Sequence, residues 1–365
     1  MSGSSSTKPT EGRLRELDGL RAISVLLVIA HHLGQYQYGR IVAPHVRAAT
    51  VFHNIGALGV MVFFVISGFV ICRLLILEEQ RYSNVSLKGF YIRRVFRILP
   101  PLYLYLALLG LLLTFGLIHE TWRGILSGAF FLYDFAPAQL GKWTVGHTWS
   151  LAVEEQFYLT FPLLWVLTRK FGRGKAFFGI FCLLAAWNLW ASSANWNQIT
   201  VPNLRAGYAC ICWGVVLASF ESRARAFGRK IPSLVAAAIA LILLWHPVGF
   251  SNWRTALYES VFMPLAIGTL LVFSLECRRW LRAVLCLKPV QAIGLSSYGI
   301  YLWQQLFTAP AKFYTAAGMP IQFLLPLLLV IVPLSYFFME RPLMRLGRRL
   351  ANRVRQDRVR EMAHG

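Results

Sequence analysis

The chain has 365 residues, of which 57% are hydrophobic and only 14% are charged, and its mean hydropathy is +0.54. Because soluble domains carry about a quarter of charged residues, this composition excludes an ordinary soluble protein. The net charge of +22 would suit a nucleic-acid-binding protein, but the basic residues stand between long apolar runs, so no nucleic-acid partner is expected. Six cysteines lie in or beside apolar segments without a CxxC pair, and neither a disulfide nor a metal site is predicted.

The apolar runs predict an all-α fold, that of a polytopic integral membrane protein. Only helices and closed barrels satisfy their backbone groups in lipid, and these runs lack the alternation of barrel strands. About ten transmembrane helices are expected from the run lengths. They are placed at residues 18–37, 55–78, 98–118, 147–169, 175–193, 204–220, 231–248, 257–275, 290–311 and 321–339.

The basic residues predict the topology. Most of the 37 Lys and Arg residues fall in segments that share one side, so this side and both termini are predicted to be cytoplasmic. The opposite side holds only Arg40, Arg47, Arg123, Lys142, Arg254 and Lys312. Residues 121–135 are too short for a span and are expected to form a re-entrant or interfacial segment on the outer side.

Three regions are expected along the chain. Residues 1–16 are polar, show no removable signal peptide and are predicted to be a disordered cytoplasmic segment. Residues 17–340 form the membrane domain, and residues 341–365 form a basic cytoplasmic tail against anionic lipid headgroups. No internal repeat is visible, which argues against an inverted-repeat transporter.

The first span, LDGLRAISVLLVIAHHLG, carries ionisable groups. Arg21 and His32 are separated by nearly three helical turns, so they share one face about 16 Å apart, and Asp18 can pair with Arg21. Ionisable residues inside a membrane indicate a functional site. The alternative is that Arg21 reaches the inner headgroups and His32 bonds a neighbouring carbonyl group.

The second span contains the stretch FFVISGFVI. A glycine in an apolar helix commonly marks close contact between helices, and this role is predicted for Gly68. The sequence leaves the role of Ser67 open.

A basic motif, KGFYIRRVFRILPPLY, precedes the third span at its cytoplasmic edge. Pro100 and Pro101 are expected to mark a bend. The tight Arg93–Arg94 pair, with Arg97 and Tyr91 nearby, could hold a polyphosphate through guanidinium forks and an aromatic ring. The alternative is plain anchoring by positive charge.

The fourth span begins HTWSLAVEEQFYLTFP and has two adjacent carboxylates. Only one of Glu154 and Glu155 is expected to face a given partner helix, and Glu154 shares a face with His147, Ser150 and Tyr158. Glu154 near His32 could orient the imidazole. The alternative is a structural hydrogen bond to another helix.

These motifs together resemble the membrane acyltransferase-3 family. Its first-helix signature is Arg, ten residues and His, which here are Arg21 and His32. GVMVFFVISGFVI, FYIRRVFRILPPLY, HTWSLAVEEQFYL, SSYGIYLWQQ and SYFFMERP resemble later family motifs, in family order. Gln304 stands where relatives usually have His, and a neutral amide can only contribute hydrogen bonds. Many relatives continue into a soluble hydrolase-like domain. No such domain is visible in this sequence, and a single-domain form is therefore expected.

The resemblance implies transfer of an acyl group, often acetyl, from acyl-CoA to a hydroxyl group, usually on a sugar. It implies that Arg93, Arg94, Arg97 and Tyr91 bind the CoA phosphates and base, and that the pantetheine arm threads past Arg21 toward His32. His32 would be the general base, Glu154 would orient it, and Arg21 would stabilise the donor or the developing oxyanion. A covalent acyl-histidine intermediate remains open.

The expected partners are the lipid bilayer, acyl-CoA and a sugar-containing acceptor, with an oligomer possible, at the bacterial inner membrane. No metal cofactor is expected. Within the same class, the acceptor could be a surface polysaccharide, a lipid-linked glycan or a small glycosylated metabolite such as a macrolide. From another class, a proton-coupled transporter could use the same His and Glu residues.

Overall fold

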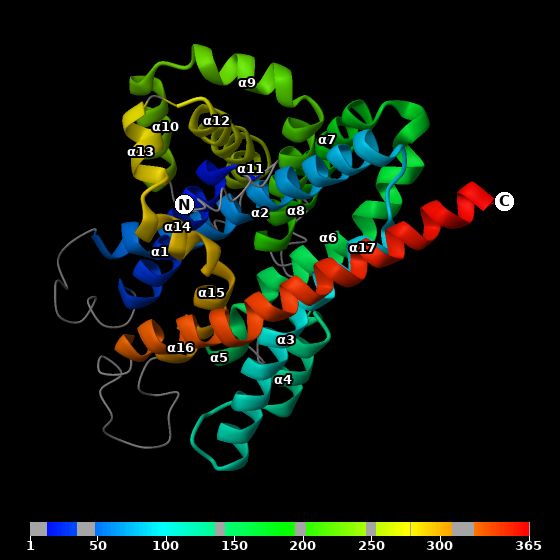
Figure 1. Cartoon of the computed structure of the whole chain (residues 1–365). Helices are drawn as coiled ribbons and strands as arrows, with labels where there is room; N and C mark the ends of the chain where they lie inside the picture. The colour runs from blue at the N-terminus through cyan, green and yellow to red at the C-terminus, as the bar shows by residue number, and fades with distance from the viewer. Residues whose placement is uncertain are drawn as a thin grey trace, which may run out of the picture.

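The computed structural model describes residues 13–34, 48–135, 143–193, 202–245, 253–277, 279–308 and 325–364. These ranges form a bundle of helices and contain no β-strand, which confirms the predicted all-α class (Figure 1). The α-helices are α1 (Arg15–Leu33), α2 (Ala48–Tyr82), α3 (Leu87–Thr114), α4 (Trp122–Ala129), α5 (Trp143–Gly146), α6 (Thr148–Leu167), α7 (Arg173–Ser193), α8 (Pro202–Ser219), α9 (Glu221–Lys230), α10 (Ser233–Trp245), α11 (Trp253–Leu257), α12 (Met263–Leu275), α13 (Arg279–Leu285), α14 (Lys288–Leu295), α15 (Ser297–Phe307), α16 (Leu328–Leu334) and α17 (Arg341–His364). Shorter helical pieces are η2 (Tyr133–Phe135), η4 (Thr168–Phe171), η6 (Tyr258–Phe262), η9 (Leu325–Leu327) and η10 (Ser335–Glu340).

Each of the ten predicted spans overlaps a helix, but ten crossings are not established. In the described ranges, 5 helices are long and apolar enough to cross a membrane, or 6 if the bent pair α9 and α10 is one span. Helices α1 and α6 have 19 and 20 residues and are not among them. Both carry ionisable groups, such as Arg21 and Glu154, that lower their hydropathy. The helices with the candidate catalytic residues are thus long but less apolar than the others.

Helices α2 and α8 cross at backbone contact. A Cβ atom at Gly68 would lie 2.0 Å from the carbonyl oxygen of Ile211, and one at Gly214 would lie 2.1 Å from that of Val65. Real Cβ atoms essentially never approach closer than 3.0 Å. The structure therefore confirms that Gly68 serves close packing, as the sequence predicts.

Ion pairs join segments that the charge bias places on the cytoplasmic side. Each acidic partner lies at or near the end of a helix that adjoins a basic segment. The pairs are Arg93–Glu78 at 2.8 Å, Arg355–Glu78 at 2.7 Å, Arg73–Glu221 at 2.9 Å, Arg225–Glu276 at 2.8 Å, Arg282–Glu16 at 2.8 Å, and Arg173–Glu79. These ion pairs support the prediction that the basic segments gather at one end of the bundle.

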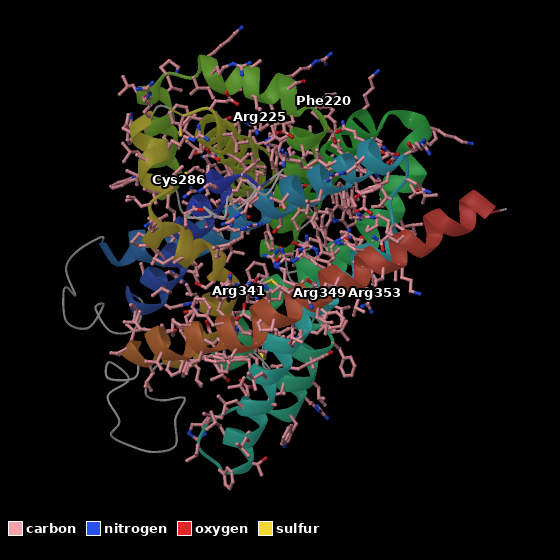
Figure 2. All side chains as sticks on the ribbon, viewed as in Figure 1. Phe220, Arg225, Cys286, Arg341, Arg349 and Arg353 are labelled. Atoms are coloured by element: carbon pink, nitrogen blue, oxygen red, sulfur yellow. The ribbon has the colours of Figure 1, made fainter. Side chains whose placement is uncertain are left out.

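The basic tail is an ordered helix that packs on α3. Helices α16 and α17 continue one another through η10, and α17 lies beside α3 (Figure 1). Ala351 is fully buried, and Gly347 faces the side chain of Phe96. The exposed arginines Arg341, Arg349 and Arg353 follow the length of α17 (Figure 2). Whether these arginines meet lipid headgroups stays a prediction.

The apolar segment at residues 121–135 contains a short helix. Helix α4 has 8 residues, which at about 1.5 Å per residue cannot cross a bilayer core of about 30 Å. Thr121 caps its N-terminus by accepting a hydrogen bond from the amide of Gly124 at 3.1 Å. This agrees with the prediction that the segment does not cross the membrane.

Candidate active site

The basic motif is helical, and this decides where its arginines point. Helix α3 begins at Leu87 because the Ser86 hydroxyl caps it, accepting from the Gly89 amide at 3.1 Å. The helix continues through Pro100 and Pro101 without a break, and the expected bend at these prolines stays a prediction. Adjacent residues on a helix diverge by about 100°, whereas residues three apart share a face. The Arg93–Arg94 pair is therefore split, and Arg94 joins Arg97.

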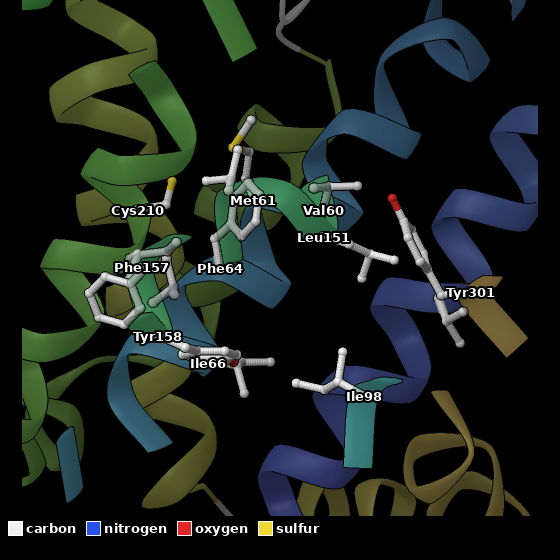
Figure 3. Packing of buried hydrophobic residues seen from close by; sticks show 14 of the residues in the cluster. Val60, Met61, Phe64, Ile66, Ile98, Leu151, Phe157, Tyr158, Cys210 and Tyr301 are labelled. Atoms are coloured by element: carbon white, nitrogen blue, oxygen red, sulfur yellow. The ribbon is translucent and has the colours of Figure 1, made fainter. Parts of the chain in front are cut away.

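One pocket collects residues from α1, α2, α3, α6 and α15. Its polar lining consists of Arg21, Ser67, Arg94, Arg97, Ser150, Glu154, Glu155, Tyr158, Ser297, Tyr298 and Tyr301. Its apolar wall includes Val60, Phe64, Ile98 and Leu151, and Figure 3 shows these side chains together with Tyr301. The atom-free space amounts to about 740 Å³, part of it open to the outside. The mixture of polar and apolar side chains in its lining is typical of a small-molecule site.

Glu154 lies at the centre of a hydrogen-bond network in this pocket. The hydroxyl groups of Ser67 and Tyr158 both donate to its Oε1 atom through short hydrogen bonds. The guanidinium of Arg94 stands 4.5 Å from the centre of the Tyr158 ring, a cation–π contact. Glu155 also lines the pocket, and the expectation that only one of the two carboxylates faces a given partner helix stays a prediction. Ser67, whose role the sequence left open, is a donor to Glu154.

Arg21 enters the pocket from α1 and is paired as predicted. Its Nη1 atom donates to the Asp18 carboxylate at 3.3 Å, and Arg13 contacts the same carboxylate at 2.6 Å. Asp18 is only 4% exposed, and the two guanidinium groups compensate its buried charge. The pair holds Arg21 near the N-terminal end of α1, where its remaining donors can meet a ligand.

Two of the predicted donor-binding residues lie outside the pocket lining. Arg93 donates to Glu78 at 2.8 Å and so joins the ion pairs described above. The Tyr91 hydroxyl donates to the backbone oxygen of Leu159 at 2.8 Å. Both contacts join α3 to neighbouring helices, so Arg93 and Tyr91 have a structural role in the described part of the chain.

His32 faces the protein interior, at Gln304. The Nδ1 atom of His32 and the Oε1 atom of Gln304 are 2.9 Å apart. The same Gln304 amide donates through Nε2 to the backbone oxygen of Tyr301 at 3.3 Å and to Oε1 of Gln305 at 3.0 Å, and its Oε1 accepts from Thr308 at 3.2 Å. Since these bonds orient the amide, Nδ1–H of His32 must be the donor. The Nε2 atom of His32 then keeps its lone pair.

The structure separates His32 from the pocket that holds Arg94. His32 is not among the pocket-lining residues, and Trp143 packs edge-on to its ring with centroids 5.0 Å apart. The described partner of His32 is Gln304 rather than Glu154, so the expected His32–Glu154 pairing is wrong. The hydrogen-bonding role expected of Gln304 is confirmed.

The late motif SSYGIYLWQQ contributes residues that sequence reasoning did not assign. Ser297, Tyr298 and Tyr301 line the pocket from α15. The Tyr301 hydroxyl lies 2.6 Å from the Ser150 hydroxyl, which joins α15 to α6. The spacing of Ser297, Tyr298 and Tyr301 on one helical face was the available signal.

Comparison with known proteins places the chain in one family. Residues 14–340 match the acyltransferase-3 model, described as an acyltransferase domain. A Staphylococcus aureus (strain COL) protein provisionally named an O-acetyltransferase is 28% identical over 369 residues, covering 92% of this chain and 58% of that protein. The peptidoglycan O-acetyltransferase OatA of Listeria monocytogenes is 26% identical over 368 residues. The matched part covers 91% of this chain and 56% of OatA. The chain thus spans little more than half of these relatives, and no solved structure matches it.

Proposed function

The chain belongs to the acyltransferase-3 family, and from this premise we propose that it transfers an acetyl group from cytoplasmic acetyl-CoA to a hydroxyl of a sugar-containing acceptor. The names of its relatives, which include a peptidoglycan O-acetyltransferase, support an acetyl donor and a glycan acceptor. The proposed setting is the bacterial inner membrane, with the donor entering from the cytoplasmic side.

The observation that carries this proposal is the meeting of Arg21, Arg94 and Arg97 with Glu154 in one pocket. Neither Arg94 nor Arg97 has an ion-pair partner within the described ranges. Guanidinium forks with free donors suit phosphate oxygens, and the Tyr158 and Phe90 rings hold the Arg94 guanidinium through cation–π contacts. Arg94 and Arg97 are therefore assigned to the CoA phosphates. Arg93 and Tyr91 contribute by fixing α3.

The reaction needs one proton transfer. The acceptor oxygen attacks the thioester carbon, a C–O bond forms, and the C–S bond breaks. His32 takes the hydroxyl proton on Nε2 and returns it to the sulfur of CoA, so the products are an ester and a free thiol. Gln304 holds the tautomer that leaves Nε2 free. Arg21 stabilises negative charge near the donor carbonyl, and Glu154 compensates the buried guanidinium charges.

The test uses the full chain in lipid nanodiscs with acetyl-CoA and a cell-envelope glycan extract. Free CoA is measured with a thiol-reactive dye, and the transferred acetyl group by a radiolabel. Arg94→Gln and Arg97→Gln should each raise KM for acetyl-CoA by about tenfold or more, since a charged hydrogen bond contributes about 1.5–3 kcal/mol. His32→Ala should abolish label transfer.

Two matched variants serve as controls. Arg123→Gln and His119→Ala change exposed residues outside the pocket, and both should keep wild-type kinetics. Wild-type protein that binds acetyl-CoA but labels no glycan would refute the acceptor class. Wild-type protein that releases no CoA would refute the donor.

A further inference from the structure

His147 is a buried imidazole that the reaction described above leaves unused. It is 4% exposed, and neither of its ring nitrogens has a hydrogen-bond partner in the described part of the chain. Tyr105 and Tyr301 hold the ring edge-on from two directions, each with centroids 5.5 Å away. A buried polar group without a partner costs folding free energy, so an apolar side chain here would favour the fold.

His147 lies directly behind the pocket wall. Its backbone oxygen accepts hydrogen bonds from Ser150 at 3.0 Å and from the Tyr301 hydroxyl at 3.2 Å. Both of these donors line the pocket. Trp143, one helical turn before His147, packs against His32. His147 is therefore joined through its backbone to two residues of the pocket wall, and it follows the tryptophan that packs on His32.

The position of His147 on the backbone adds an electrostatic argument. It is the N-cap residue of α6, a helix of 20 residues. The N-terminus of a helix carries a partial positive charge, which disfavours an imidazolium and favours negative charge nearby. A neutral imidazole in this place can donate its N–H to an oxygen that becomes negative during a reaction.

We propose that His147 is a second catalytic imidazole, whose ring N–H donates a hydrogen bond to the carbonyl oxygen of the acyl group as the acceptor attacks. This inference rests on the proposed acyl transfer. The carbonyl oxygen gains negative charge as the C–O bond forms and loses it as the C–S bond breaks. His147 keeps its proton throughout, and the hydroxyl proton travels through His32 to the thiolate.

The test compares His147→Phe, which removes the donor, with His147→Gln, which keeps one. In nanodiscs with acetyl-CoA and the envelope glycan extract, His147→Phe should lower kcat by about 10²–10³-fold, as loss of an oxyanion donor does. KM for acetyl-CoA should stay near the wild-type value, and Tm should be unchanged or higher. His147→Gln should recover part of kcat.

Asn188 provides a matched control. It is 3% exposed, its Oδ1 atom has no partner in the described ranges, and it lies on α7 outside the pocket. Asn188→Leu should keep both Tm and kcat. Full kcat in His147→Phe would overturn the inference, and so would a fall in Tm, which would mean a structural role. Absence of CoA release by the wild-type protein would instead refute the proposed function.

Discussion

The substitution Gly68→Ala should separate α2 from α8 and disturb the pocket at the same time. The added Cβ atom would lie 2.0 Å from a backbone oxygen and needs at least 3.0 Å, so one helix must move by about 1 Å. The added Cβ atom would clash with backbone atoms of Ile211, so rotation of a side chain cannot relieve the clash. Overpacking of this kind costs about 1–3 kcal/mol, and we expect the upper end.

The movement has a functional consequence because Ser67 is the neighbouring residue. A shift of α2 relative to α6 lengthens or bends the hydrogen bond from Ser67 to Glu154. We expect Tm to fall by about 5 °C or more, together with a lower kcat. The measurements are thermal unfolding by tryptophan fluorescence and CoA release in nanodiscs.

A second glycine separates this effect from the general effect of alanine in a helix. Gly179, on α7, has open space where a Cβ would lie. Gly179→Ala should raise stability by about 0.5–1 kcal/mol, because alanine is the better helix former. If Gly68→Ala melted like Gly179→Ala and kept full activity, the close crossing of α2 and α8 would be refuted.

Two further substitutions test the hydrogen bonds of the site. Tyr158→Phe removes one donor to Glu154 but keeps the ring against Arg94, so kcat should fall about tenfold at nearly constant KM for acetyl-CoA. The measurement is steady-state CoA release. An unchanged kcat would show that this hydrogen bond does not contribute to the reaction. Gln304→Met removes the acceptor of the His32 Nδ1–H and should lower kcat about tenfold, whereas Gln304→Glu keeps an acceptor and should restore most of it. Equal rates for Met and Glu at this position would contradict the positioning role.

The sequence predicts the helical class and much of the pocket, because both depend on local patterns. Arg21 with Asp18 follows from helical spacing, and the apolar runs define the helices. Arg93 and Arg94 point apart because the basic motif is part of helix α3. The predicted span begins only at residue 98, whereas α3 begins at Leu87, so this separation was not predicted from the sequence.

Long-range pairings are harder to predict. His32 and Gln304 are 272 positions apart, and no local spacing relates them. The packing of α1 against α15 brings them together, and the sequence alone does not define this contact. The same holds for the Ser67 bond to Glu154, since α2 and α6 are separate in the chain. Tertiary arrangement, rather than residue type, therefore decides which carboxylate or amide meets the imidazole.

The distribution of charge explains how a membrane bundle can hold these groups. The pocket lining brings Glu154 and Glu155 together with Arg21, Arg94 and Arg97, so the opposite charges partly compensate one another without a direct ion pair between these residues in the described ranges. Polyphosphate binding at the arginines would disturb this balance and leave the carboxylates without their full share of positive charge. Donor binding should thus weaken the attraction between the arginines and α6, which carries Glu154 and follows its N-cap residue His147. If the proposed donor binds at Arg94 and Arg97, its binding should therefore also change the freedom of Glu154 and His147, because both depend on the same helix.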